Sequence, residues 1–254
     1  MMKNNDYQLG LVSVSFRKYT VKEILDEMKA TGLSCVEWGS DVHAPCNDIE
    51  RLCEIAAMQK EYGIKCVSYG TYFRFGETPM EELESYIKAA KILNTNILRL
   101  WCGRKSGADM TAEEKNEMLS MCRQAAAIAE KHEVTLCLES HQLTLTENPD
   151  DAVWLMQEVN SPNFRMYWQP FQWQTAEENC VNAAKIAPYA EHIHVFYRRD
   201  GQKVSLHEAI GEWQAYLQKF STPRALLLEF MPKGSIEELA AEAAALRMIA
   251  GETV

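Results

Sequence analysis

The chain alternates short apolar runs with longer segments whose apolar residues recur at helical spacing. The runs begin every 25 to 38 residues, at 9–16, 34–38, 65–69, 96–101, 134–139, 164–168, 192–196 and 225–230. Between them, residues such as Val21, Ile24, Leu25 and Met28 follow the i, i+3, i+4, i+7 pattern that gathers apolar side chains on one face of a helix. Because a crossover between parallel strands needs about a dozen residues or more, this spacing predicts eight β/α units.

Capping residues mark the predicted helix starts. Ser or Thr is followed three residues later by Glu before six helical stretches, at Thr20, Thr78, Thr111, Thr175, Ser205 and Ser235. In such a capping box the hydroxyl accepts the N–H of the third helical residue and the Glu accepts the N–H of the cap. The two other starts carry Asn47, with Glu50 three residues on, and Asn148, with Pro149 at the first helical position.

Strands and helices in strict alternation form a parallel sheet, which is either open and doubly wound or closed into a barrel. Two features favour closure. There are eight units, and no G-x-G-x-x-G motif follows the first strand, as it would in a dinucleotide-binding fold. No linker or change of composition divides the chain. The sequence therefore predicts a single-domain (β/α)₈ TIM barrel over residues 1–254.

Polar residues gather at the carboxyl ends of the predicted strands, where the active site of such a barrel lies. One face of the fifth strand is wholly apolar, so its other face, which carries Glu139, points into the barrel. The same argument applies to Glu229, which shares a face with Leu227. A buried carboxylate must be paired or bind a metal ion. The alternatives are an ion pair, for example with Arg99, and a functional centre, which we favour.

The seventh predicted strand places His192 and His194 on one face. Beside two inward-facing glutamates, this pair favours a metal site over a packed core histidine. Mixed Glu and His ligands suit Mg²⁺, Mn²⁺, Co²⁺ or Zn²⁺. Trp38, Trp101 and Trp168 also lie at strand ends, where each is either a wall for a sugar ring or part of the packing at the rim.

Composition and charge exclude several classes of partner. A net charge of −10 disfavours nucleic acid, which needs a basic surface. No stretch approaches the roughly 20 apolar residues of a membrane helix. The opening MMKNNDYQ lacks the apolar segment of a secretory signal, and the eight cysteines form no C-x-x-C motif. We expect a reduced, cytoplasmic protein that acts on a small carbohydrate, with a homo-oligomer left open.

Five segments resemble the xylose isomerase-like TIM-barrel family, the sugar phosphate isomerase/epimerase group that includes endonuclease IV. They are VEWGSDVHAP at 36–45, LRLWCG at 98–103, LCLESH at 136–141, EHIHVF at 191–196 and LLLEF at 226–230. The resemblance covers essentially the whole chain and implies the same barrel.

The family metal site corresponds to four positions of this chain: Glu139, Gln169, His194 and Glu229. The family's strand-six motif is D-x-x-H, whereas this chain has Gln at both positions, 169 and 172. The resemblance therefore implies a site with two carboxylates instead of three and a lower metal affinity, for which His141 is a candidate to compensate.

The activity that the resemblance implies is metal-assisted isomerisation or epimerisation of a sugar, sugar acid or sugar phosphate. A divalent cation (Mn²⁺, Mg²⁺, Co²⁺ or Zn²⁺) would stabilise an enediolate while Glu139 and Glu229 exchange a proton with the substrate. The residues that we expect to bind the substrate are His43, Arg99, Trp101, His141, Trp168, His192 and Arg198.

Two other functions stay open on the same scaffold. One is an inosose-type dehydratase or lyase, which begins with the same proton abstraction. The other is a non-catalytic sugar-binding barrel, suggested by the replacements at Gln169 and Gln172. A metal-dependent nuclease is disfavoured by the negative charge and by the scarcity of His and Asp ligands.

Overall fold

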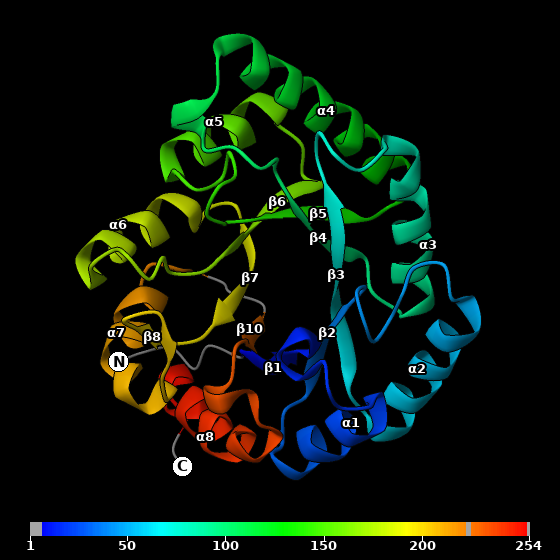
Figure 1. Cartoon of the computed structure of the whole chain (residues 1–254), viewed down its shortest axis with the longest axis vertical. Helices are drawn as coiled ribbons and strands as arrows, with labels where there is room; N and C mark the ends of the chain where they lie inside the picture. The colour runs from blue at the N-terminus through cyan, green and yellow to red at the C-terminus, as the bar shows by residue number, and fades with distance from the viewer. Residues whose placement is uncertain (1–6, 222–224, 253–254) are drawn as a thin grey trace.

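The computed structural model describes residues 7–221 and 225–252, and its centre is a closed barrel of parallel strands inside a ring of helices (Figure 1). The strand order is β1-β10-β7-β6-β5-β4-β3-β2. The barrel strands are β1 Gln8–Val12, β2 Cys35–Gly39, β3 Lys65–Arg74, β4 Ile97–Trp101, β5 Thr135–Glu139, β6 Phe164–Trp168, β7 Ala190–Val195 and β10 Ala225–Leu228. The predicted TIM barrel is confirmed.

The helices follow the strands in alternation. They are α1 Val21–Ala30, α2 Ile49–Tyr62, α3 Leu83–Ile92, α4 Ala112–Lys131, α5 Pro149–Val159, α6 Ala176–Ile186, α7 Ile210–Leu217 and α8 Leu239–Ala250. Short 3-10 turns are η1 Ser13–Phe16, η2 Met80–Glu82, η3 Gly107–Asp109, η4 Leu206–Ala209, η5 Pro232–Gly234 and η6 Ile236–Glu238. Among the helices of the described ranges, none is both long enough and apolar enough to cross a membrane.

Alternation along the strands separates two apolar layers. Outward-facing residues such as Leu138 pack under the helices in the large core, whereas inward-facing residues such as Cys137 and Leu227 form a smaller core inside the barrel. Two residues further along each strand the side chain again points inward, one layer nearer the mouth. At that level charged side chains replace apolar ones: Glu139 comes two residues after Cys137, and Glu229 two residues after Leu227.

Four of the predicted helix starts are confirmed. Reciprocal capping boxes are present at Thr20, Thr111 and Thr175, and the Asn148 side chain accepts from the second residue of α5, which begins with Pro149. These caps satisfy backbone N–H groups that the first helical turn leaves without partners.

The other four predicted helix starts differ in the structure. Asp48, not Asn47, caps α2, since its carboxylate accepts the N–H of Arg51 at 3.1 Å. In the remaining three cases a 3-10 turn comes before the helix and no reciprocal box forms, at Thr78, Ser205 and Ser235.

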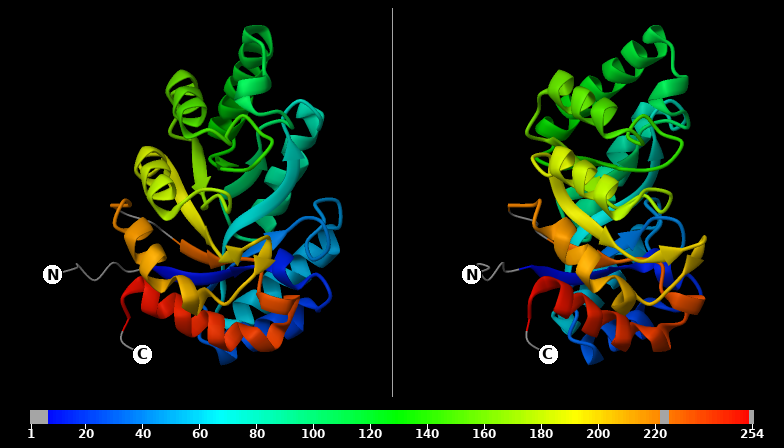
Figure 2. Two further views of the ribbon diagram at one scale, coloured as in Figure 1. Left: turned by 60° about the vertical axis from the view of Figure 1, so that its left-hand side comes forward. Right: turned by 90° about the vertical axis from the view of Figure 1, so that its left-hand side faces the viewer.

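A small antiparallel hairpin in the loop after β7 was not predicted by the hydrophobic pattern. Its strands are β8 Arg198–Arg199 and β9 Gln202–Lys203. Asp200 and Gly201 form its tip with φ of 50° and 74°, as a two-residue type I′ turn requires. The Asp-Gly dipeptide was the available signal. Figure 2 shows this yellow segment standing out from the carboxyl-end face of the barrel.

The difference between helix starts with and without a reciprocal capping box gives a test of the fold. We expect Thr175→Ala to lower the free energy of unfolding by about 1 kcal/mol, because the first turn of α6 loses its cap. Ser235→Ala is the matched control, since the sequence suggests a box there but the structure has none; its effect should stay within about 0.5 kcal/mol. Urea denaturation measures both. Equal losses would contradict the assignment.

Candidate active site

A buried arginine joins two glutamates at the centre of the barrel. Arg99, on β4, donates from Nε to Glu37 Oε1 at 2.9 Å and from Nη1 to Glu139 Oε2 at 2.8 Å. The three side chains are at most 4% exposed. Gly70 makes room for this contact, because a Cβ there would lie 2.6 Å from Glu37 Oε1. The two ion pairs therefore tie β2, β4 and β5 together at the level where the charged layer begins.

His194, on β7, lies among three carboxylates. Its Nε2 is 3.5 Å from Glu37 Oε2, while its Nδ1 is 3.3 Å from Glu139 Oε1 and 3.5 Å from Glu229 Oε2. The Tyr167 ring packs against the imidazole in a T-shaped contact, with centroids 5.0 Å apart. The glutamates and the histidine predicted from the fifth, seventh and eighth strands are thus brought together.

The donor atoms of this cluster fit a divalent cation. One ligand atom each of Glu139, His194 and Glu229 lies within 4.8 Å of the others. The buried atoms of the described residues that have no hydrogen-bond partner include His194 Nδ1, Glu229 Oε2 and Gln169 Oε1. Buried polar atoms without partners are costly, and imidazole nitrogen with carboxylate oxygen suits the metals named above. Gln169 offers an uncharged oxygen as a further donor.

Glu37 was missed by the sequence analysis. Its side chain is fully buried and accepts from Ser68 at 2.7 Å as well as from Arg99. It also faces Nε2 of His194, the position from which a second carboxylate orients a metal-binding imidazole. The signal was available: Cys35 and Glu37 alternate in the same way as the inward-facing pair of the fifth strand.

The carboxylates differ in how easily they ionise. For Glu139, burial opposes ionisation, but Arg99 and His194 lower the pKa to about 2. Burial raises the pKa of Glu229 to about 7, opposed by the charge of His194. Burial also opposes the charged form of His194, yet Glu229 and Glu37 raise its pKa to about 10. A cation entering this site must therefore displace protons from His194 and Glu229.

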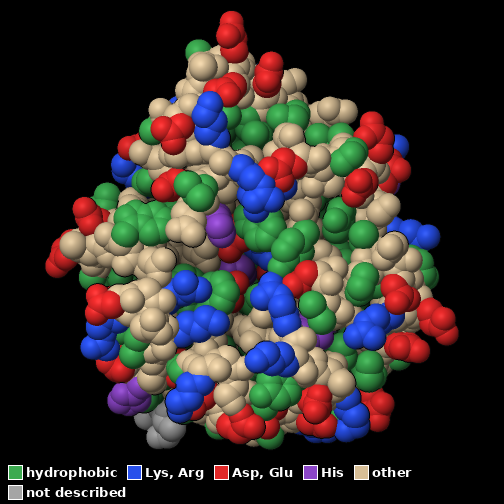
Figure 3. Space-filling model, in the orientation of Figure 1, with side chains coloured by type: hydrophobic (Ala, Val, Ile, Leu, Met, Phe, Trp, Pro, Cys, Tyr) green, Lys and Arg blue, Asp and Glu red, His purple; other side chains and the backbone are tan. Residues whose placement is uncertain are grey.

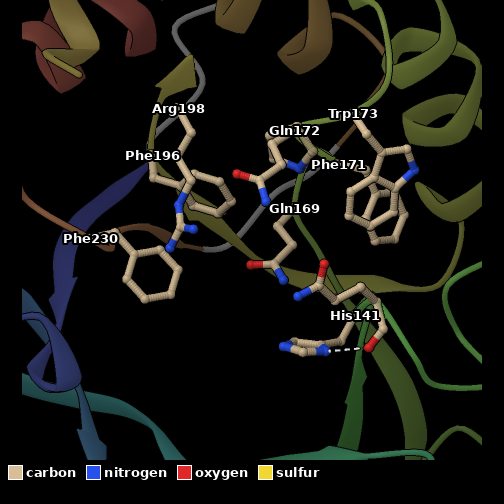
Figure 4. Close-up of a pocket in the computed structure, with 10 residues that line it drawn as sticks. His141, Gln169, Phe171, Gln172, Trp173, Phe196, Arg198 and Phe230 are labelled. Atoms are coloured by element: carbon tan, nitrogen blue, oxygen red, sulfur yellow. Dashed lines mark hydrogen bonds between the residues drawn. The ribbon is translucent and has the colours of Figure 1, made fainter. Parts of the chain in front are cut away.

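The hollow above the charged layer is visible at the centre of the face in Figure 3. Trp101 Nε1 donates to Glu139 Oε2 at 2.5 Å, and its ring contacts the guanidiniums of Arg74 and Arg99 and lies near His141. The outer part of the hollow, shown in Figure 4, is lined by His141, Gln169, Phe171, Gln172, Trp173, Phe196, Arg198 and Phe230, among others. Of the residues expected to bind substrate, Trp101, His141 and Arg198 lie at this mouth.

Arg99 and Trp168 do not lie where we expected. Arg99 is 3% exposed, and its guanidinium is already paired with two glutamates, so the ion pair that we set aside for Glu139 is present. Trp168 points outward from β6 and packs beneath the helices against Trp213, Tyr216 and Phe220. The exposed tryptophan at the mouth is Trp173, at 51%.

His192 and His43 also lie away from the mouth, which corrects our expectation for both. His192 is one inward-facing layer below His194; its Nε2 donates to the Val67 carbonyl at 3.2 Å, and it lines a cavity at the amino ends of the strands. His43 is buried in the loop after β2, where its Nε2 donates to the Tyr19 carbonyl at 3.0 Å.

Comparison with known proteins identifies the family. A family model described as "Xylose isomerase-like TIM barrel" matches residues 25–221. The chain belongs to this family. It is 25% identical over 119 residues to a 3-dehydroshikimate dehydratase of Bacillus anthracis, a match that spans 46% of this chain and 42% of that relative. The chain spans less than half the length of the curated relatives that it matches.

Solved structures share the fold at low sequence identity. The probable 3-DHS dehydratase AsbF of Bacillus anthracis superposes with a TM-score of 0.80 at 20% identity, covering 94% of this chain and 98% of that one. The IolI protein with a bound zinc atom gives 0.76 at 14% identity, covering 96% and 98%. An L-ribulose 3-epimerase gives 0.74 at 13% identity, covering 96% and 95%. The solved structures that share this fold thus include a probable dehydratase and an epimerase.

Removal of the shared guanidinium should strongly destabilise the fold. We expect Arg99→Met to lower the free energy of unfolding by about 3 to 5 kcal/mol, because Glu37 and Glu139 are left buried with only His194 to balance their charge. Arg104→Met is the control: its ion pair with Glu77 is exposed and should contribute about 1 kcal/mol or less. Urea denaturation at neutral pH measures both, and a loss below about 1 kcal/mol in Arg99→Met would contradict this account.

Metal binding should release protons in a pH-dependent manner. With pKa values of about 10 for His194 and about 7 for Glu229, Mn²⁺ should displace about two protons at pH 6 and about one at pH 8. Affinity should rise with pH because fewer protons then compete. Isothermal titration in buffers of different ionisation enthalpy counts the protons. Release that does not change with pH would show that these two groups are not the ligands.

Proposed function

We propose that this protein is a divalent metal-dependent enzyme that removes a proton next to the carbonyl group of a small hydroxylated substrate, and that it acts as a sugar isomerase or epimerase. The observation that carries the proposal is the convergence of Glu139, His194 and Glu229, with ligand atoms within 4.8 Å of one another beneath an open mouth. A bound cation would supply Lewis-acid stabilisation of the charge that develops on the carbonyl oxygen.

The two glutamates are not equivalent in their surroundings. Arg99 and Trp101 both donate to Glu139 Oε2, so this carboxylate is fixed in place. Glu229 Oε2 accepts no hydrogen bond from the described residues. Glu229 is therefore the better placed of the two to take a proton from carbon, and Glu139 to hold its position as a ligand.

This asymmetry favours isomerisation over a two-base epimerisation. In the isomerisation, Glu229 takes the proton from the hydroxyl-bearing carbon and returns it to the neighbouring carbonyl carbon. The hydroxyl proton moves in the same direction, from the hydroxyl oxygen to the former carbonyl oxygen, so that atoms and charge balance. An epimerisation would need Glu139 to deliver a proton from the other face, against its contacts with Arg99 and Trp101.

A dehydratase is the second candidate, favoured by the 3-dehydroshikimate dehydratase match and by the AsbF superposition. The first step is the same proton removal. The hydroxyl on the next carbon then leaves with a proton as water, and a carbon–carbon double bond forms. Gln169 and Gln172 keep the non-catalytic alternative as an outcome of the test, since they bring no charge to the site.

Solvent deuterium exchange tests the proposal. With added Mn²⁺, the wild-type protein should incorporate deuterium next to the carbonyl of at least one member of a panel of ketoses and 3-dehydroshikimate. Glu229→Gln at saturating Mn²⁺ should lower the exchange rate by at least about a hundredfold, because the proton acceptor is lost. Glu84→Gln, an exposed position, is the matched control.

The products separate the candidates. A ketose converted to an aldose indicates isomerisation, an inverted centre indicates epimerisation, and loss of water indicates the dehydratase. Wild-type exchange in Glu229→Gln would end the proposal. Measurable sugar affinity without exchange or metal binding would establish the sugar-binding alternative instead.

A further inference from the structure

Two cations lie side by side at the mouth without an ion-pair partner among the described residues. Arg198 and Lys203 are directly opposite each other in the β8–β9 hairpin, a position at which like charges are destabilising. Within the described part of the chain, neither of them forms an ion pair, and the Nε of Arg198 is buried without a hydrogen-bond partner. The neighbouring Arg199 differs, since it pairs with Glu208.

Both cations lie over one aromatic ring. Arg198 Cζ is 4.4 Å and Lys203 Nζ 5.3 Å from the centroid of Phe230, and Arg198 Cζ is also 5.8 Å from that of Phe196. Figure 4 shows the guanidinium between these two rings, facing the hollow. An aromatic face stabilises a cation but does not neutralise it, so the pair keeps its positive charge.

The backbone below this ring is strained. Phe230 has φ of 59°, a region that bulky residues rarely adopt, and its N–H donates to Ser15 Oγ at 3.1 Å. It directly follows Glu229, so the turn sends the carboxylate into the barrel and the ring to the mouth. Strain of this kind persists where the surrounding structure over-determines it, often at ligand sites.

The remaining charges nearby do not neutralise the pair. Arg17 adds positive potential at Lys203, but its own partner is Asp41. Glu229 attracts Lys203 without forming an ion pair with it, and it faces His194 in the centre. Burial first, and then Arg198, lower the pKa of Lys203. Figure 3 shows Lys and Arg side chains gathered around the hollow, although the chain as a whole is acidic.

We infer that Arg198 and Lys203 form a subsite for an anionic group of the substrate, a carboxylate or a phosphate, at the end away from the carbon that reacts at Glu229. This inference rests on the proposed function for the identity of the reacting end, but the subsite itself is defined by the hairpin and Phe230. A planar guanidinium and an ammonium over one ring can both bind the oxygens of such a group.

Paired probes test the subsite by binding alone. The pairs are D-ribulose with D-ribulose 5-phosphate, and 3-dehydroshikimate with its methyl ester, each titrated calorimetrically in the presence of Mn²⁺. In the wild type the charged member of at least one pair should bind about tenfold more tightly or better, and the preference should shrink as salt is raised. The pair that shows it distinguishes phosphate from carboxylate.

The variants locate the preference. The double variant Arg198→Met/Lys203→Met should reduce the preference for the charged probe to about onefold. Each single change should reduce this preference in part, and Arg199→Gln should leave it unchanged. Thermal unfolding checks that the variants fold. Equal binding of charged and neutral members, no binding of either charged member, or a preference that survives in a folded double variant would overturn the inference.

The same samples separate this inference from the proposed function. Deuterium exchange into a ketose by the wild type, together with equal binding of the charged and neutral members of both pairs, would leave the function standing and remove the subsite. A charge preference that depends on Arg198 and Lys203, without exchange into any probe, would leave the subsite standing and remove the function.

Discussion

The contact of Arg99 with Glu37 and Glu139 is the interaction on which the site depends. Three carboxylates come together in the barrel where water is excluded, and their mutual repulsion would be prohibitive without a fixed counter-charge. Arg99 offsets two of them and leaves the third, Glu229, to balance against His194. The difference between Glu139 and Glu229 follows from this arrangement. Glu139 is fixed in place by its ion pair, whereas Glu229 keeps one oxygen without a hydrogen-bond partner among the described residues.

Most of the fold follows from periodicity. The eight strands and eight helices were predicted because the switch from alternating to helical spacing recurs along the whole chain. The helix starts were predicted only where the cap lies next to the first helical turn, as at Thr111 and Thr175. At Ser235 the local motif is intact, but a 3-10 turn intervenes, and its formation depends on how the preceding loop packs, which a four-residue pattern does not encode.

The site was predicted as far as the phase of a strand determines it. The alternation of side chains along a strand shows which residues face the barrel interior, so Glu139, His194 and Glu229 converge. Trp168 falls on the outward-facing set and does not join them. The alternation does not show how deep along the barrel axis a residue lies. His192 faces inward as expected, but it lies one layer below His194, nearer the amino ends of the strands. Loop residues have no regular alternation of side chains. Neither His43 nor the hairpin with its two cations could therefore be placed by this reasoning.

The hairpin has a further consequence for how such a barrel diversifies. The chemistry is built into strands whose residues interlock, so that even Gly70 leaves no space for a methyl group. Arg198 and Lys203, in contrast, lie on a hairpin closed by its own Asp-Gly turn. A change in this hairpin alters which molecules are admitted without touching the reacting groups, so selectivity can evolve separately from catalysis.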